Sequence, residues 1–493
     1  MRIRNAQTLA GHGNRKMRAD VAAILEAGMT AGDPYGHTRE LVRIEGGKLR
    51  IGGKDFEPTG TPLPGDVTLD LAAIDRIYVF GAGKGIQRAA EALEEALGDR
   101  LTGGHIILKY GDDAALRTIG VTYGGHPIPD EGCVKGCETI ARQIKEAKLT
   151  PKDVVFTIIG NGVSSLLTLP AGGLSLEDIM EVTRVLQIEK GAPTRALNMV
   201  RNSVDLLKGG RITRMLYPAQ MFHILTIDCN TGMSGKSGYE GLTETNIWLQ
   251  TLPDASSAQD ALEIIHRYEA WDDISDAVKS FLQAMPPEQE SLKKDEFERM
   301  GCRIYGVVPD RMGAMPAAFA KAEELGYAPY LVNRKSFDLD AAESGKFMAY
   351  MADLIASDNT PFAAPCALFM GGEKVVKVGR EGGVGGRNQE FCVAAASVIA
   401  ENDRIAVGSV DTDGTDGPGG DFHPEARALG ITALAGAIVD GTTKAAAKSR
   451  GHSLENALLA HDTSPLLWDI GDAVWATHSI SVQDLTVVLV GEA

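Results

Sequence analysis

Short apolar runs that end in glycine and lead into a helical pattern recur along the first half of this 493-residue chain. Each such unit predicts a buried strand, a tight loop and a helix. Repeated alternation of this kind is typical of parallel α/β layers, in which ligands collect beyond the carboxyl ends of the strands. We therefore expect an α/β fold with strands at 77–80, 105–108, 154–159 and 222–227, and with helices at 85–97, 133–147, 176–188 and 196–207.

The length of the chain predicts more than one hydrophobic core. Residues 258–299 are helical in pattern and highly charged, which is typical of a connector between domains, and a fresh α/β pattern begins near residue 302. We expect two Rossmann-like α/β domains with largely parallel sheets, at residues 1–297 and 298–493. The active site is then expected in the cleft between them.

The net charge of −17 argues against a nucleic-acid partner, because the chain has no basic face to replace phosphate counterions. Six scattered cysteines form no CxxC pair and are expected to be small buried fillers in a reducing cytosol. The N-terminus lacks the apolar segment of a secretory signal, and no apolar stretch is long enough to cross a membrane. We expect a cytoplasmic enzyme that acts on a small molecule. No heptad or apolar seam fixes an oligomeric state, and a homodimer stays open.

Two motifs in the last third of the chain combine a cationic helix start with an acidic strand end. The motif GGRNQE at 385–390 opens a helical pattern, and the apolar run 405–410 ends on a glycine-rich turn with three aspartates. A helix N-terminus favours an anion, and carboxylates are ligands for a divalent metal. This combination suits phosphoryl transfer. The candidate residues are Arg387, Asn388 and Glu390 at the helix start and Asp411, Asp413 and Asp416 as metal ligands.

A glycine loop with a lysine, GAGK at 81–84, follows the first predicted strand. Gly81 and Gly83 allow backbone N–H groups to approach an anion, and Lys84 stands at the positive end of the next helix. A dinucleotide fingerprint would need glycine at position 86, where the chain has isoleucine, and a Walker loop would need a longer spacer. A tight turn with a solvated lysine is an equally good interpretation of this spacing.

Further polar residues follow the other predicted strands, each with a structural alternative. A loop amide and two hydroxyls can bind an anion or cap a helix start, and a strand-end carboxylate can reach a metal or cap a loop. A lone histidine is more often structural, and an arginine on a helix is more often solvated. These candidates are Asn161, Ser164, Ser165, His126, Arg201 and Asp228.

Taken in order, these motifs make the chain similar to the type-2 glycerate kinase family, some of whose members are labelled hydroxypyruvate reductases. The resemblance covers nearly the whole chain and includes GAGK at 81–84, GGHPIPDEG at 124–132, GGRNQE at 385–390 and TDGTDGPGG at 412–420. It implies ATP- and Mg²⁺-dependent phosphorylation of D-glycerate at its 2-hydroxyl, on two α/β domains around a deep cleft. It places the family's functional lysine on Lys84, its arginine on Arg387, and its acidic loop on Asp413 and Asp416.

The chain departs from the family pattern at several loops. Residues 160–165 read GNGVSS in place of the family's SGGGSA loop, and residues 421–434 are an insertion. These changes favour a larger or differently substituted hydroxy acid. In the kinase interpretation Lys84 and Arg387 stabilise charge or clamp the substrate carboxylate, and Asp228 or Asp411 orients the hydroxyl. The alternatives are a non-catalytic binding homologue and an NAD(P)H-dependent hydroxypyruvate reductase, against which the missing fingerprint counts.

Overall fold

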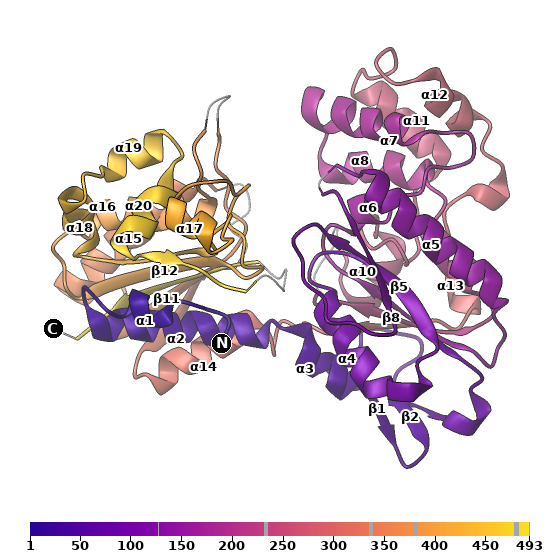
Figure 1. Ribbon diagram of the computed structural model, residues 1–493, viewed down its shortest axis with the longest axis horizontal. Helices are drawn as coiled ribbons and strands as arrows, with labels where there is room; N and C mark the ends of the chain where they lie inside the picture. The colour runs from indigo at the N-terminus through magenta and orange to yellow at the C-terminus, as the bar shows by residue number, and fades with distance from the viewer. Residues whose placement is uncertain (127, 231–234, 335–338, 379–381, 478–482, 493) are drawn as a thin grey trace. The chain divides into compact units, whose positions relative to one another are not determined.

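The structure is a computed structural model that describes residues 1–493 except 127, 231–234, 335–338, 379–381, 478–482 and 493, and except the side chains of 188 and 288. The chain divides into two compact units (Figure 1). We call Pro34–Pro309 the N-terminal domain, and Met1–Asp33 together with Asp310–Ala493 the C-terminal domain. Both contain a sheet covered by helices, which confirms the predicted α/β class.

The N-terminal domain is built on a sheet of six parallel strands in the spatial order β6-β5-β4-β7-β8-β9. The strands predicted at 77–80, 105–108 and 154–159 are confirmed, and the one predicted at 222–227 ends two residues earlier. The six strands are β4 (Ile77–Ala82), β5 (Gly103–Lys109), β6 (Gly120–Gly124), β7 (Val154–Ile159), β8 (Gln220–Leu225) and β9 (Arg303–Gly306). A small antiparallel sheet precedes them, formed by β1 (Val42–Glu45), β2 (Lys48–Ile51) and β3 (Val67–Asp70).

Both faces of the six-stranded sheet carry a hydrophobic core, because successive residues of a strand point to opposite sides. Val79 and Phe156 belong to one core, whereas Phe80 and Val155 belong to the other. The first core is covered by α3 (Pro34–Leu41) and α4 (Gln87–Leu97). The second is covered by α5 (Glu131–Ala147), α6 (Val163–Leu166), α9 (Arg211–Leu216), α10 (Gly238–Glu244) and α13 (Lys294–Arg299).

A further group of helices in this domain encloses a core of its own. It consists of α7 (Leu176–Thr183), a π-helical turn (Arg184–Glu189), α8 (Thr194–Ser203), α11 (Ala258–Arg267) and α12 (Asp276–Gln283). The stretch 258–299, interpreted from its charge as a connector, therefore belongs to the N-terminal domain. The stretch has a buried apolar face as well as its charged residues, since Ala261, Ile264 and Ile265 are buried. The strand that follows, β9, pairs with β8 in the same sheet, so the units separate at 309/310 and not at 297/298.

The C-terminal domain has a six-stranded sheet in the order β10-β11-β15-β12-β13-β14. The strands are β10 (Ala328–Asn333), β11 (Cys366–Gly372), β12 (Ile405–Asp411), β13 (Gly436–Asp440), β14 (Ala473–Val474) and β15 (Asp484–Val490). Only β10 and β11 pair in parallel, and the other four pairs are antiparallel. The expectation of a largely parallel sheet does not hold here, because the last strand of the chain inserts between β11 and β12 and runs opposite to both.

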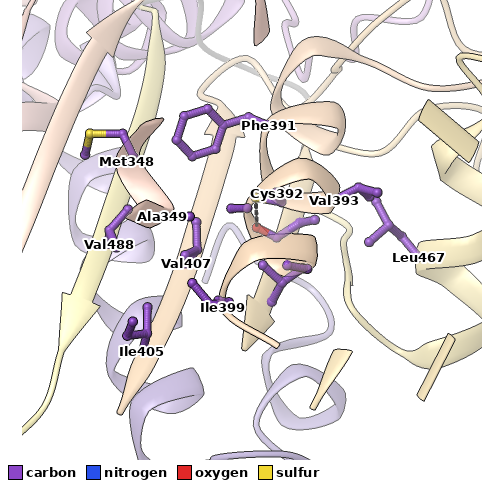
Figure 2. Packing of buried hydrophobic residues seen from close by; sticks show 14 of the residues in the cluster. Met348, Ala349, Phe391, Cys392, Val393, Ile399, Ile405, Val407, Leu467 and Val488 are labelled. Atoms are coloured by element: carbon purple, nitrogen blue, oxygen red, sulfur yellow. Dashed lines mark hydrogen bonds between the residues drawn. The ribbon is translucent and has the colours of Figure 1, made fainter. Parts of the chain in front are cut away.

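Helices cover both faces of the C-terminal sheet (Figure 1). One face carries α1 (Ala6–Leu9), α2 (Arg15–Ala31) and α14 (Ala314–Glu324); the other carries α15 (Ala341–Asp358), α16 (Arg387–Val398), α17 (Pro424–Ala428), α18 (Thr443–Ser449), α19 (Leu454–Leu459) and α20 (Thr463–Ile470). Figure 2 shows Phe391 and Cys392 of α16 in one cluster with Ile405 and Val407 of β12, while Val393 points towards Leu467 of α20. This packing fixes α16, and with it the GGRNQE motif, on the sheet.

Residues 1–33 were expected in the N-terminal domain but lie in the C-terminal one. Helix α2 buries Val21, Ile24 and Leu25 against the C-terminal sheet. The contact is close at Gly28, where an added Cβ would stand 2.4 Å from a methyl group of Leu485. The apolar face of α2 therefore decides the domain to which the start of the chain belongs.

All six cysteines are buried as thiols, as expected for small apolar fillers. Among the described residues, no helix is both long and apolar enough to span a membrane.

Candidate functional site

Three strand ends meet at one edge of the C-terminal sheet. Because β15 is antiparallel to β11 and to β12, its first residue lies beside their last ones. Asp484 is in register with Gly372 of β11 on one side and with Asp411 of β12 on the other. The loops that follow β11 and β12, and the start of α16, therefore gather around Asp484.

Arg387, the predicted functional arginine, is held at this edge between two aspartates. Its Nε lies 2.9 Å from both carboxylate oxygens of Asp484, and its Nη2 donates to Asp411 Oδ2 at 2.7 Å. Burial opposes the charge on Arg387, but Asp484 and Asp411 outweigh it and raise the pKa of the guanidinium above its usual value. Burial, together with repulsion from Asp413, raises the pKa of Asp411 well above its ordinary range. The structure thus brings two predicted residues, Arg387 and Asp411, into direct contact.

The start of α16 was predicted to bind an external anion, but a carboxylate of the protein occupies it. Asp416 accepts hydrogen bonds from the backbone N–H of Asn388 at 3.1 Å and of Gln389 at 2.9 Å. The Asn388 side chain donates to Asp416 and to Asp484, and it accepts from Ser409 Oγ at 2.6 Å. Burial raises the pKa of Asp416 to about 6, although the hydrogen bonds from the helix start oppose the shift. Asn388 and Asp416 therefore stabilise the helix start itself.

The three predicted metal ligands do not converge on one point. Asp411 pairs with Arg387, Asp416 caps α16, and Asp413 accepts from the Thr415 hydroxyl and N–H. No group of three or more His, Cys, Asp or Glu in the described part of the chain has the arrangement of a metal site. Asp411 and Asp416 are buried, and Asp413 is the half-exposed carboxylate of the set. A Mg²⁺ ion carried on nucleotide phosphates needs only one or two protein carboxylates, and Asp413 fits that smaller requirement.

Glu390 was predicted to contact substrate or phosphate, and in the structure the buried Glu390 side chain pairs with the half-exposed His461. Glu390 Oε1 lies 2.9 Å from His461 Nδ1, and burial raises the pKa of Glu390 while His461 opposes the shift. The same segment of the chain binds the glycine-rich loop before α16, through Gly383 N–H to Ala460 O at 2.9 Å and Val384 N–H to Asp462 at 2.8 Å. Glu390 therefore helps to fix that loop.

In the N-terminal domain the GAGK loop lies at the carboxyl end of β4, beside the loop that follows β7. Lys84 N–H donates to Asn161 O at 2.7 Å, which joins the two loops. Added Cβ atoms at Gly81 and Gly83 would stand 2.2 Å from Ile158 O and 2.6 Å from Gly160 N. These two glycines are thus required by the close approach of β4 and β7, whatever the loop binds.

A third loop reaches the same place from β6. An added Cβ at Gly162 would stand 2.8 Å from His126 Cδ2 and 3.2 Å from Lys84 Cγ, so Gly162 separates these side chains. Ser165 is buried and donates to Gly125 O at 2.9 Å, which ties the start of α6 to the histidine loop. The structure thus brings Lys84, Asn161 and His126 together, with half-exposed Ser164 on α6.

Asp228 and Arg201 complete the predicted set. Half-buried Asp228 follows β8, the neighbour of β7, and therefore lies at the same edge of the sheet as the loops of Lys84 and Asn161. Arg201 lies on α8 in the helical group and donates to Thr183 Oγ1 at 2.9 and 3.1 Å. Burial lowers the pKa of Arg201 to about 10, which contradicts the alternative of a solvated helix-end charge.

Two residues of the C-terminal edge were missed by sequence reasoning. Asp484 stands before its strand, and in the parallel sheet that was expected it would lie at the far edge from Asp411. Lys374 follows β11 and is buried, with its Nζ 3.3 Å from Asp484 Oδ2 and 3.2 Å from Thr486 Oγ1. A charged residue just after the apolar run 367–370 is a signal that could have identified Lys374.

Comparison with known proteins gives two family matches. Residues 20–232 match a family described as a domain of unknown function, DUF4147, and residues 366–481 match the MOFRL family. A D-glycerate 2-kinase from Thermotoga maritima is 30% identical over 426 residues, which cover 86% of this chain and 93% of that protein. A glycerate 2-kinase from Pyrococcus horikoshii is 28% identical over 442 residues, which cover 90% of each chain.

A solved structure of glycerate kinase from T. maritima has a TM-score of 0.73 to this chain at 24% identity, and covers 96% of this chain and 99% of its own. At that identity the likeness shows the fold. The alignment with the relative of 30% identity covers most of both chains, and the two family matches lie one after the other along this sequence. The chain belongs to the type-2 glycerate kinase family.

Proposed function

We propose that this protein is an ATP- and Mg²⁺-dependent kinase that phosphorylates the 2-hydroxyl of D-glycerate or of a related small sugar acid. The names of its relatives support the reaction class. The observation that carries the proposal is the setting of Arg387, a permanently charged guanidinium fixed by two aspartates at a strand edge where loops gather. Phosphoryl transfer depends mainly on positioning and on charge stabilisation, and a fixed arginine supplies both.

In this proposal Arg387 and Lys84 supply the positive charge that the reaction requires. Arg387 pairs with the substrate carboxylate or with the transferring phosphoryl group, since its planar fork suits either anion. Asp413 would hold the Mg²⁺ of the nucleotide complex, which when bound neutralises phosphate charge. Asp228 is the proposed acid that orients the attacking hydroxyl, because it is half-buried at the edge of the sheet where the loop of Lys84 lies.

The loop after β7 suggests a substrate larger than glycerate. Asn161, whose backbone carbonyl accepts from Lys84 N–H, adds a side-chain amide with a donor and an acceptor where the family pattern has glycine. A site that hydrogen-bonds an additional hydroxyl discriminates against a ligand that lacks it. We therefore propose that a four- or five-carbon polyhydroxy acid is phosphorylated at least as efficiently as D-glycerate.

The residue at position 86 argues against the reductase alternative. A dinucleotide fingerprint uses glycine there so that helix and strand approach closely, whereas Ile86 is fully buried in the domain core. A nicotinamide dinucleotide therefore has no support from the loop after β4.

The test is a kinetic panel with the purified full chain. ADP release is measured with D-glycerate, erythronate, threonate and a pentonate, with and without excess EDTA, while NADH oxidation with hydroxypyruvate is followed in parallel. We expect EDTA-sensitive ADP release and no NADH consumption. NADH-dependent reduction of hydroxypyruvate would overturn the proposal. A wide preference for D-glycerate would refute only the proposal of a larger substrate.

A further inference from the structure

Asp484 contacts three residues of the C-terminal edge from the start of β15. Its oxygens lie 2.9 Å from Arg387 Nε, 2.9 Å from Asn388 Nδ2 and 3.3 Å from Lys374 Nζ. The side chains of Asp484 and Lys374 are 0% and 1% exposed, so this pair is shielded from water. Buried charges require partners, and here two cations surround one carboxylate.

Arg387 is held through two of its three side-chain nitrogens. Nε faces Asp484 and Nη2 faces Asp411, and no residue in the described part of the chain accepts a hydrogen bond from Nη1. The side chain is 23% exposed, whereas Asp484 is not exposed at all. The guanidinium is therefore fixed through Nε and Nη2, and Nη1 is the nitrogen that can donate to an anionic oxygen of a ligand.

We infer that Asp484 is a positioning residue for the kinase reaction: it fixes Arg387 so that the Nη1 edge meets the anionic group of the ligand. Lys374 balances the charge that Asp484 would otherwise bring into the core. The identity of the anion rests on the proposed function, but the orientation of Arg387 by Asp484 does not.

The first test is a double-mutant cycle on ADP release. Asp484→Asn keeps the shape of the side chain and removes its charge, and it should lower kcat/KM by about 10- to 100-fold. It should change the same parameter, kcat or KM, that Arg387→Lys changes. In an Arg387→Lys background the further loss should be less than about threefold, because the positioned group is already gone. Equal losses in both backgrounds, or activity within about twofold of the unaltered protein, would overturn the inference.

The matched control is Asp153→Asn. Asp153 is also buried and also holds an arginine, with Arg76 Nε at 2.8 Å and Nη2 at 2.7 Å. It precedes β7 and so lies at the opposite edge of its sheet from the loops of Lys84 and Asn161. We expect a lower Tm and unchanged kcat/KM. A loss of kcat/KM as large as that of Asp484→Asn would mean that any broken buried ion pair has this effect, and would overturn the inference.

The second test is independent of activity and uses NMR of arginine labelled with ¹⁵N at Nε. One Nε–H signal, assigned by its disappearance in Arg387→Lys, should exchange slowly with water. Its exchange should become faster by about tenfold or more in Asp484→Asn and stay unchanged in Asp153→Asn. Unchanged exchange in Asp484→Asn would contradict the inference. Slow exchange in a chain that phosphorylates no sugar acid would contradict the proposed function alone.

Discussion

Replacing Asp416 with alanine tests whether this aspartate caps α16 or binds a metal. The change removes the acceptor of two backbone N–H groups, those of Asn388 and Gln389, while the Asn388 side chain keeps Asp484. Asn388 and Gln389 are fully buried, so water does not replace the lost acceptor of their N–H groups. A buried donor without a partner costs roughly 1–3 kcal/mol, which gives a loss of about 2–6 kcal/mol in the free energy of unfolding. Asp416→Asn keeps one acceptor oxygen and should cost less.

The assay is calorimetry combined with hydrogen exchange over 387–398. For a domain of roughly 200 residues, 1 kcal/mol corresponds to about 2–4 °C in Tm, so the C-terminal transition should fall by about 4 °C at the least. Amides of the first turn of α16 should lose protection in Asp416→Ala. The matched variant Asp413→Ala should show the reverse pattern: loss of activity, with stability changed by less than about 1 kcal/mol. An unchanged Tm in Asp416→Ala together with a weakened Mg²⁺ dependence would refute the capping role.

Three further predictions concern the N-terminal domain. Lys84→Ala should lower kcat by about 10²–10³ with Tm nearly unchanged, measured by ADP release and calorimetry, and near-full activity would exclude Lys84 from the site. Gly83→Ala should destabilise the domain by about 1–3 kcal/mol in urea unfolding, because φ is +150° and the new Cβ would stand 2.6 Å from Gly160 N. The control is Gly98→Ala, where φ is also positive but an added Cβ would have no described atom within 4 Å. Burial lowers the pKa of His223 to about 3, so between about pH 6.5 and 3 the unfolded chain binds one more proton than the folded chain at this residue. The free energy of unfolding should then fall with decreasing pH by about 1.4 kcal/mol per unit from this residue, and a His223→Gln variant with the same slope would contradict this assignment.

The sequence predicted the elements of both domains well because each carries a strong local signal. Strand 154–159 is buried at every residue and α16 begins at the arginine of GGRNQE, as expected. The division into domains was less predictable, since it depends on contacts between distant segments. The apolar face of α2 packs on the C-terminal sheet, and β9 completes the N-terminal one. Neither contact can be predicted from the hydrophobic pattern of the segment that makes it.

Within the candidate site, residue types were easier to predict than roles. The glycines of GAGK were interpreted as an anion loop, yet a close approach of two backbones needs glycine for the same steric reason. The aspartates at and after the end of β12 were interpreted as metal ligands, yet a helix start attracts a carboxylate of the protein as readily as an external anion. Asp484 could not be found without the direction of β15, because a strand's first residue joins the last residues of its neighbours only in an antiparallel pairing.

The position of the transferred phosphate tests the central proposal most directly. The full chain is incubated with ATP, Mg²⁺ and D-glycerate, and the product is examined by ¹H-coupled ³¹P NMR. Phosphorylation at the 2-hydroxyl gives a doublet, because the phosphorus couples to the single proton on C2. A triplet from the C3 methylene would contradict the proposed regiochemistry, and the absence of any ATP-dependent phosphate ester across the sugar-acid panel would contradict the kinase assignment.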